Sequence, residues 1–144
     1  MRHENGIGQF GAAIDVIVGA SARRARQLER LGKQPLLLPT TGLIDLGAQR
    51  THVHIDLLNQ LCIPKIANGI PVSTTFGQVR THGKYDVHLI LVGSGNRLLD
   101  LENIEVLDLF SDHPKIQVLI GQDILNQCER FTYEGKAGIF SLEV

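Results

Sequence analysis

Asp45 is the residue in this sequence whose neighbours suit its side chain least. It follows the apolar pair Leu43-Ile44 and precedes Leu46 and Gly47. A carboxylate in such a run is poorly hydrated, and aspartate is rarely buried without a partner. The spacing alone leaves two interpretations open. Asp45 caps a turn before Gly47, or it is held at the end of a buried strand to serve a chemical purpose.

Two other residue types could do chemistry, but their spacing favours a structural role. His52 and His54 alternate along a predicted strand and would share one face, as a pair of metal ligands could. The sequence puts no third ligand beside them, so we expect surface or packing histidines and no metal. Cys62 and Cys128 are too few for a disulfide framework or a four-thiolate zinc site, and we expect both to pack in the core.

The composition is that of an ordinary soluble globular protein. The 144 residues suit a single domain spanning 1–144, with residues 1–11 as a flexible N-terminus. Lys and Arg number 14 and Asp and Glu 15, and the net charge of −1 argues against a protein that neutralises nucleic-acid phosphates. No apolar run is long enough to span a bilayer, and no signal-peptide pattern opens the chain. We therefore expect a cytoplasmic protein with no nucleic-acid partner and no membrane partner.

The elements that must position these residues are mostly short strands. Glycine is frequent, with 15 residues, and the apolar runs are brief and bounded by turn residues. The patterns predict strands at 12–18, 36–38, 51–55, 72–79, 84–92, 118–121, 130–133 and 138–144, with one or two more within 98–109. They predict helices at 21–31, 56–61 and 122–128, the first with a basic, solvated face. Asp15 interrupts the first strand and should point outward.

Four ordered segments of the chain carry a resemblance to a known family. Residues 42–51 read Gly-Leu-Ile-Asp-Leu-Gly-Ala-Gln-Arg-Thr, residues 74–77 read Thr-Thr-Phe-Gly, residues 118–125 read Val-Leu-Ile-Gly-Gln-Asp-Ile-Leu, and residues 131–144 suit a closing hairpin. In order and spacing they resemble the retropepsin-like aspartic proteases in their bacterial single-domain form. The family motifs concerned are the catalytic Asp-Thr-Gly-Ala stretch, the flap hairpin, a Gly-Arg-Asp motif between apolar residues, and the final hairpin.

The resemblance implies a mostly β fold, a closed acid-protease barrel with a flap hairpin and two or three short helices. It makes Asp45 the catalytic aspartate. It assigns catalytic-loop support to Leu46, Gly47 and Ala48, the substrate-covering flap to Thr75, Phe76 and Gly77, and a second structural motif to Gly121, Gln122 and Asp123. The chemistry of this family needs two carboxylates that share a proton, and the chain holds one such Asp. The resemblance therefore implies a C2 homodimer that hydrolyses a peptide or protein substrate without a cofactor.

Two positions depart from the family pattern. Leu46 stands where the family has Thr or Ser, whose hydroxyl bonds across the dimer axis, and Leu46 cannot make that bond. Gln122 stands where the family has Arg, and a neutral amide makes weaker hydrogen bonds than a charged group. Two functions therefore stay open. One is a homodimeric aspartic endopeptidase, and the other is a catalytically weak or inactive dimer of the same fold that binds peptides or partner proteins.

Overall fold

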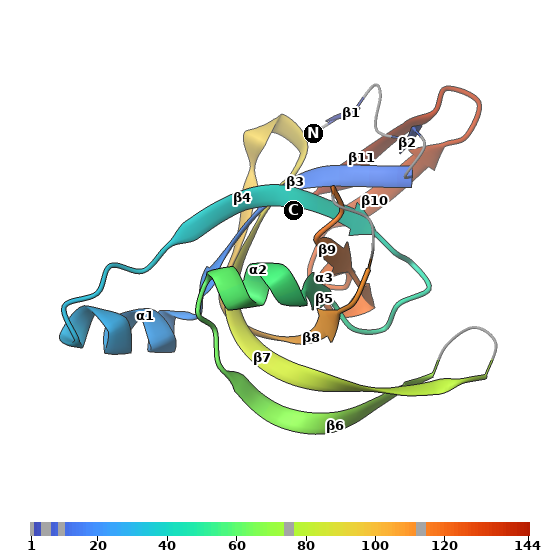
Figure 1. The fold of residues 1–144 in the computed structure, drawn as a ribbon. Coiled ribbons are helices and arrows are strands. Elements are labelled where there is room, and N and C mark those ends of the chain that lie inside the picture. The colour runs from blue at the N-terminus through green and yellow to red at the C-terminus, as the bar shows by residue number, and fades with distance from the viewer. Residues whose placement is uncertain (1, 4–6, 9–10, 74–76, 112–114) are drawn as a thin grey trace.

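The computed structural model describes residues 2–3, 7–8, 11–73, 77–111 and 115–144 (Figure 1). Its strands are β1 (Arg2–His3), β2 (Ile7–Gly8), β3 (Gly11–Ala20), β4 (Leu37–Ile44), β5 (His52–His54), β6 (Lys65–Ser73), β7 (Val79–Val92), β8 (Leu98–Leu109), β9 (Val118–Ile120), β10 (Arg130–Glu134) and β11 (Ile139–Glu143). Its helices are α1 (Ala22–Arg30), α2 (Ile55–Gln60) and α3 (Gln122–Leu125), with a 3-10 turn η1 (Ser94–Asn96).

Six of the strands close into a barrel. Around it the order is β3, β4, β9, β5, β8 and β7, and β7 pairs back with β3 (Figure 1). The β4–β9 and β5–β8 pairs are parallel, whereas the other barrel pairs are antiparallel. β2 pairs beside β3 and β6 beside β7, while β1, β11 and β10 form a separate three-stranded sheet. The expectation of a mostly β, closed barrel with short helices is confirmed.

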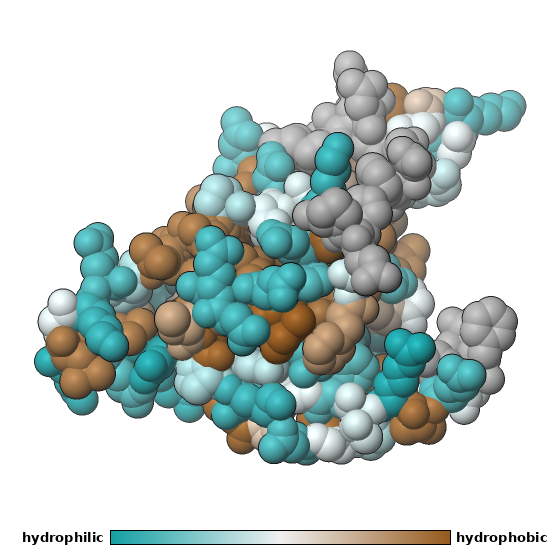
Figure 2. All heavy atoms as spheres, viewed as in Figure 1, coloured by the Kyte–Doolittle hydropathy of each residue, from teal (hydrophilic) through white to brown (hydrophobic). Residues whose placement is uncertain are grey.

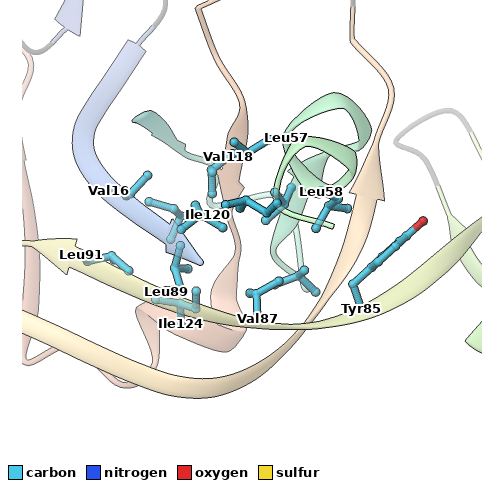
Figure 3. Packing of buried hydrophobic residues seen from close by; sticks show 14 of the residues in the cluster. Val16, Leu57, Leu58, Tyr85, Val87, Leu89, Leu91, Val118, Ile120 and Ile124 are labelled. Atoms are coloured by element: carbon cyan, nitrogen blue, oxygen red, sulfur yellow. The ribbon is translucent and has the colours of Figure 1, made fainter. Parts of the chain in front are cut away.

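The barrel is filled by alternate residues of its strands. From Tyr85 to Leu91, every second side chain of β7 is buried. Residues of β3, β9 and α2 meet them in one cluster, which includes Val16, Ile120 and Leu58 (Figure 3). Burying one such side chain contributes about 1.5–3 kcal/mol. Asp15 lies on β3 between two buried residues and is exposed, as the period of two predicts.

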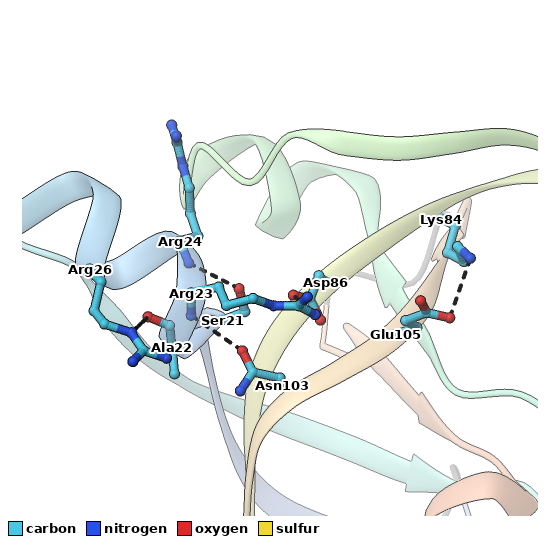
Figure 4. A network of polar contacts seen from close by, with 9 residues as sticks. All are labelled: Ser21, Ala22, Arg23, Arg24, Arg26, Lys84, Asp86, Asn103 and Glu105. Carbon is cyan, nitrogen blue, oxygen red and sulfur yellow. Dashed lines mark hydrogen bonds and ion pairs between the residues drawn. The ribbon is translucent and has the colours of Figure 1, made fainter.

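α1 begins at a side-chain cap and lies on the outside of the barrel. The Ser21 hydroxyl accepts a hydrogen bond from the N–H of Arg24 at 3.2 Å. Leu28 is the buried residue of the helix. On the exposed side, Arg23 donates to the Asp86 carboxylate of β7 at 3.2 Å (Figure 4). The Arg23 backbone N–H also donates to Asn103 Oδ1 of β8 at 3.2 Å, so the basic helix is attached to the barrel by an apolar contact, a hydrogen bond and a partly exposed ion pair.

The end of the molecule that α1 forms also carries apolar surface. Leu31, Leu36 and Leu37, which follow the helix and lead into β4, are more than half exposed. Figure 2 shows apolar side chains at this end interspersed with polar ones. Among the helices of the described segments, none is long and apolar enough to cross a membrane.

β4 is one continuous strand, so the prediction of a strand that ends at residue 38 is wrong. It stays extended because it pairs with β3 along nearly all of its length. Gly42 belongs inside this strand for a steric reason. A Cβ atom at that position would lie 2.9 Å from Cδ1 of Ile120 and 3.1 Å from Cγ1 of Val16, so a larger residue would have to displace these two buried side chains.

The hairpin of β6 and β7 also differs from the prediction. The sequence predicted strands at 72–79 and 84–92, with residues 80–83 connecting them. In the structure residues 80–83 belong to β7, which pairs with β6. The change of direction lies between Ser73 and Val79 instead. The pattern of β6 was missed because register shifts interrupt its pairing with β7 between Lys65 and Ile70, which breaks the alternation of its side chains.

Leu89→Ala should lower the free energy of unfolding by about 2–5 kcal/mol, because Leu89 is fully buried and a closed barrel cannot collapse around the cavity. Leu98→Ala is the matched control. Leu98 begins β8 and is 60% exposed, so its truncation should change the free energy of unfolding by less than about 0.5 kcal/mol. Urea unfolding followed by circular dichroism measures both. Equal losses in the two variants would contradict the placement of Leu89 in the core.

Candidate active site

Asp45 is the first residue beyond β4, and its backbone continues the ladder of that strand. β4 and β9 run parallel, and the Asp45 N–H donates to the carbonyl of Ile120 at 3.0 Å. The side chain is partly buried, and its Oδ1 accepts from the N–H of Gly47 at 3.0 Å. This is the turn-capping contact that the sequence allowed. Within the described part of the chain the second oxygen, Oδ2, accepts no hydrogen bond, so it remains open for chemistry.

Gln122 holds the Asp45 loop (residues 45–51) against α3. Its side-chain Nε2 donates to the carbonyl of Leu46 at 2.8 Å, and its backbone N–H donates to the carbonyl of Ala48 at 2.8 Å. The neutral amide therefore supports the loop through backbone oxygens and needs no charged partner. The side chain of Leu46 is 58% exposed at the tip of the loop, where the family pattern has a hydroxyl.

Thr51 joins the two segments through a buried set of hydrogen bonds, which we call the loop brace (Thr51, Gly121 and Asp123). The Thr51 hydroxyl donates to Asp123 Oδ1 at 2.7 Å and accepts from the N–H of Gly121 at 3.0 Å. The Thr51 N–H donates to Asp123 Oδ2 at 3.0 Å. Thr51 is fully buried, and its bond to Gly121 is buried with it, whereas the bonds to Asp123 are partly buried. The brace fixes the end of the Asp45 loop to the start of α3.

Gly121 is required by the close approach of the two backbones. A Cβ atom there would lie 2.6 Å from the carbonyl carbon and oxygen of Arg50 and 3.0 Å from the Ala48 oxygen. No side chain fits at those distances. Sequence reasoning singled out Gly121 and Asp123 but gave Thr51 no role. Its signal was present, since Thr51 is the Thr that follows the Asp-x-Gly-Ala stretch at a fixed distance.

The hairpin assigned to the flap extends away from the barrel (Figure 1). β7 pairs with β8 from Lys84 onward, so residues 79–83 pair with β6 alone. Gly77 has φ of +77°, a conformation that glycine adopts without strain. Thr75 and Phe76, also assigned to the flap, lie outside the described residues. The structure therefore describes the limbs of the hairpin and Gly77.

The two histidines of β5 do not form a site together. His52 is buried and its ring lies edge-on to that of His82, with centroids 5.1 Å apart. His54 donates through Nε2 to the carbonyl of Ser111 at 2.8 Å. Among the described residues, no group of three His, Cys, Asp or Glu side chains could hold a metal ion. The packing interpretation of these histidines agrees with their contacts, whereas His82 was not predicted to approach them.

The two cysteines lie in different surroundings. Cys62 is exposed, so the prediction that it packs in the core is wrong. It sits at the end of α2 in a left-handed conformation, with φ of 54°, which turns the chain toward β6. Cys128 packs against the core, and burial raises the pKa of its thiol. A thiol with a raised pKa is a poor nucleophile at neutral pH.

Comparisons with known proteins concern the fold. The sequence matches no protein-family model and no curated protein. Among solved structures, the chain is similar to a retropepsin-like aspartic protease from Rickettsia conorii at 10% identity and a TM-score of 0.48, with 90% of each chain covered. It is also similar to the retroviral protease-like domain of Ddi1 from Leishmania major at 9% identity and a TM-score of 0.44, covering 90% of this chain and 86% of that one.

Thr51→Val should lower the free energy of unfolding by about 1–3 kcal/mol, because it keeps the volume but leaves the Gly121 N–H without its acceptor and removes one of the donors to Asp123 Oδ1. Thr51→Ser is the control, because it keeps the hydroxyl and loses a methyl group. Chemical unfolding of the three proteins measures the difference. The valine variant should be less stable than the serine variant, and a valine variant as stable as the unmodified protein would contradict the loop brace.

Proposed function

We propose that the chain is a homodimeric aspartic endopeptidase in which each copy contributes Asp45. The observation that supports it is the setting of this residue. Asp45 lies just beyond a barrel strand, in a loop held by buried hydrogen bonds, and keeps one carboxylate oxygen free of partners within the described residues. A rigidly held carboxylate at the rim of a barrel suits acid–base chemistry, because a displacement of about 1 Å can cost on the order of 100-fold in rate. The motif resemblance supports the same assignment.

The second carboxylate must come from another copy. Peptide hydrolysis of this kind needs two carboxylates about 3 Å apart that share one proton, because like charges this close cannot both ionise. Asp123 is the other carboxylate at the loop, and its two oxygens already accept hydrogen bonds from Thr51 and the Ile124 N–H. A C2 axis beside Asp45 supplies the missing group, since it brings the same residue of each copy together.

In this dimer the Asp45 pair activates a water molecule. The ionised carboxylate takes a proton from the water, which attacks the carbonyl carbon of the scissile peptide, and the protonated carboxyl group donates to the carbonyl oxygen. No metal, cofactor or covalent intermediate takes part. The substrate is an extended peptide that adds as a strand beneath the hairpin of β6 and β7, with its backbone hydrogen-bonded and alternate side chains in pockets. Closure of the hairpin over it excludes water.

Leu46 supports a second candidate function, a dimer that binds peptides or partner proteins without cleaving them. Its exposed apolar side chain cannot make a hydrogen bond across the dimer axis. The two loops would then meet through apolar contact alone, and the Asp45 pair would be held less rigidly. The Gln122–Leu46 hydrogen bond favours the endopeptidase, because it supports the backbone of each loop from within its own chain.

Asp45→Asn should lower peptide cleavage at least about 100-fold, because it removes the group that transfers protons. Asp15→Asn is the matched control, since Asp15 is an exposed aspartate on β3 and its change should leave cleavage unaltered. Cleavage of a mixed peptide library between about pH 4 and 7, at high protein concentration, measures both.

Equal cleavage by the Asp45→Asn and unmodified proteins would contradict the assignment of Asp45. An unmodified protein that is folded and dimeric, binds peptides and cleaves none would favour the binding module. In that case Leu46→Thr, which restores the hydroxyl of the family pattern, is expected to produce cleavage.

A further inference from the structure

Asp108 lies where the hairpin of β6 and β7 leaves the barrel. It is 3% exposed; its Oδ1 accepts from Nδ1 of His82 at 2.9 Å and its Oδ2 accepts from the N–H of Gly83 at 3.0 Å. The backbone pairing of β7 with β8 begins one residue later, at Lys84 opposite Leu107. The Asp108 side chain therefore attaches β7 to β8 at the place where the backbone ladder has ended.

The backbone is shaped for this contact. A Cβ atom on Gly83 would lie 2.9 Å from Asp108 Oδ2 and 2.8 Å from Cε of Lys65. Glycine is therefore the residue that lets the carboxylate reach the N–H of β7. A buried carboxylate that loses its partners is strongly unfavourable, so this attachment is worth more than an exposed ion pair.

His52 connects this attachment to the loop brace. Its ring meets the ring of His82 with centroids 5.1 Å apart and planes at 77°. Its Nδ1 lies 2.9 Å from the carbonyl oxygen of Arg50, which can only accept, so Nδ1 carries the hydrogen. The next residue, Thr51, makes the hydrogen bonds of the brace. A continuous set of contacts thus joins the base of the hairpin to the loop that carries the proposed catalytic aspartate.

The cluster holds one buried carboxylate for two imidazoles. The titratable groups that face the two rings and their attachment come from four elements: Asp108 of β8, Tyr85 of β7, Asp123 of α3, and Lys65 of β6, which reaches Gly83 with its aliphatic end. When both imidazoles are protonated, two cations lie close together against one anion, and charges interact strongly where water is excluded. Burial, and then the neighbouring His82, lower the pKa of His52 below its ordinary value of 6.5.

We infer that His52, His82 and Asp108 are positioning residues that set, according to pH, how firmly the hairpin of β6 and β7 is held to the Asp45 loop. At neutral pH His52 is uncharged and the contact between the two rings is intact. On acidification the His52 ring gains a proton, which its buried position beside His82 disfavours, and the base of the hairpin loosens. That this hairpin covers a substrate rests on the proposed function, but the coupling between hairpin and loop does not.

The direction of the effect follows from linkage. When the two rings separate and His52 reaches water, its pKa returns to about 6.5. At a pH between this value and the lowered pKa of the folded state, His52 therefore binds a proton in the opened cluster but not in the closed one. The closed cluster is therefore stable at neutral pH and becomes less stable as the pH falls below 6.5. The opening equilibrium should increase by at most about tenfold for each unit by which that pKa is lowered.

Amide hydrogen exchange in the protein without substrate tests this inference. Peptides from β6 and from the first half of β7 are compared at about pH 5 and 7.5 after correction for the intrinsic exchange rate, with β3 as the internal reference. In the unmodified protein the hairpin amides should lose protection at the lower pH while β3 does not. His52→Asn should abolish this pH dependence, because its amide can still donate to the Arg50 carbonyl but does not titrate.

His88→Gln is the matched control. His88 also lies on β7 and pairs through Nε2 with a carboxylate of β8, Asp100, but outside the cluster. This variant should keep the pH dependence of the unmodified protein. The inference is overturned if the unmodified protein shows no pH dependence, if His52→Asn retains it, or if His88→Gln abolishes it.

A titration by nuclear magnetic resonance needs no variant. The amide of Gly83, which donates to Asp108, should shift with the midpoint of the His52 ring, below pH 6.5. A Gly83 amide that does not respond, or whose midpoint differs from that of the His52 ring, overturns the inference. Neither measurement depends on cleavage. If Asp45→Asn leaves cleavage unaltered while the hairpin still responds to pH, only the proposed function is wrong. If Asp45→Asn abolishes cleavage while the hairpin does not respond to pH, only the positioning role is wrong.

Discussion

The candidate site depends on one buried hydroxyl. Thr51 Oγ1 donates to Asp123 and accepts from Gly121, and these partners lie 72 and 70 residues further along the chain. Through this atom the end of the Asp45 loop is fixed to the start of α3 at a position that is largely protected from water. The parallel pairing of β4 with β9 fixes the other end of the loop. Asp45 therefore sits between two anchored points, which limits the motion of its carboxylate.

The same anchors explain how the chain tolerates its departures from the family pattern. Gln122 holds the Leu46 carbonyl from within its own chain, so the loop keeps its backbone geometry without an arginine. What this support cannot supply is a second carboxylate, because the acidic groups that reach the loop and the hairpin base, Asp123 and Asp108, are both engaged in hydrogen bonds. Under the proposed function, the single chain therefore supplies one of the two carboxylates, on a loop that is anchored at both ends.

Local signals in the sequence were sufficient for most of the strands and for the turn at Asp45, whereas the closed barrel was predicted only through the motif resemblance. The alternation of β7 predicted its buried face, and the apolar run into Gly47 predicted a carboxylate at a turn. Local signals failed where distant segments decide the outcome. β4 stays extended through Thr40 and Thr41 because it pairs with β3, and no feature of that segment alone shows it.

The role of Asp108 also depends on strand pairing that the sequence alone does not show. Asp108 interrupts an apolar run between Leu107 and Leu109 in the same way that Asp45 interrupts its own, and this pattern was a usable signal that the sequence reading passed over. Its partners could not be read from spacing, since His82 lies 26 residues earlier on another strand. The contact of His52 with His82 likewise exists only because β5, β8 and β7 follow one another around the barrel.

The central claim is that two copies of Asp45 form one site, and a mixing experiment tests it most directly. Unmodified protein and the Asp45→Asn variant are combined at fixed total concentration, allowed to exchange subunits, and assayed for peptide cleavage. If each site needs both aspartates, mixed dimers are inactive, and an equal mixture retains about one quarter of the unmodified activity. A retained activity of about one half, falling linearly with the fraction of variant, would contradict the account, because each Asp45 would then act alone.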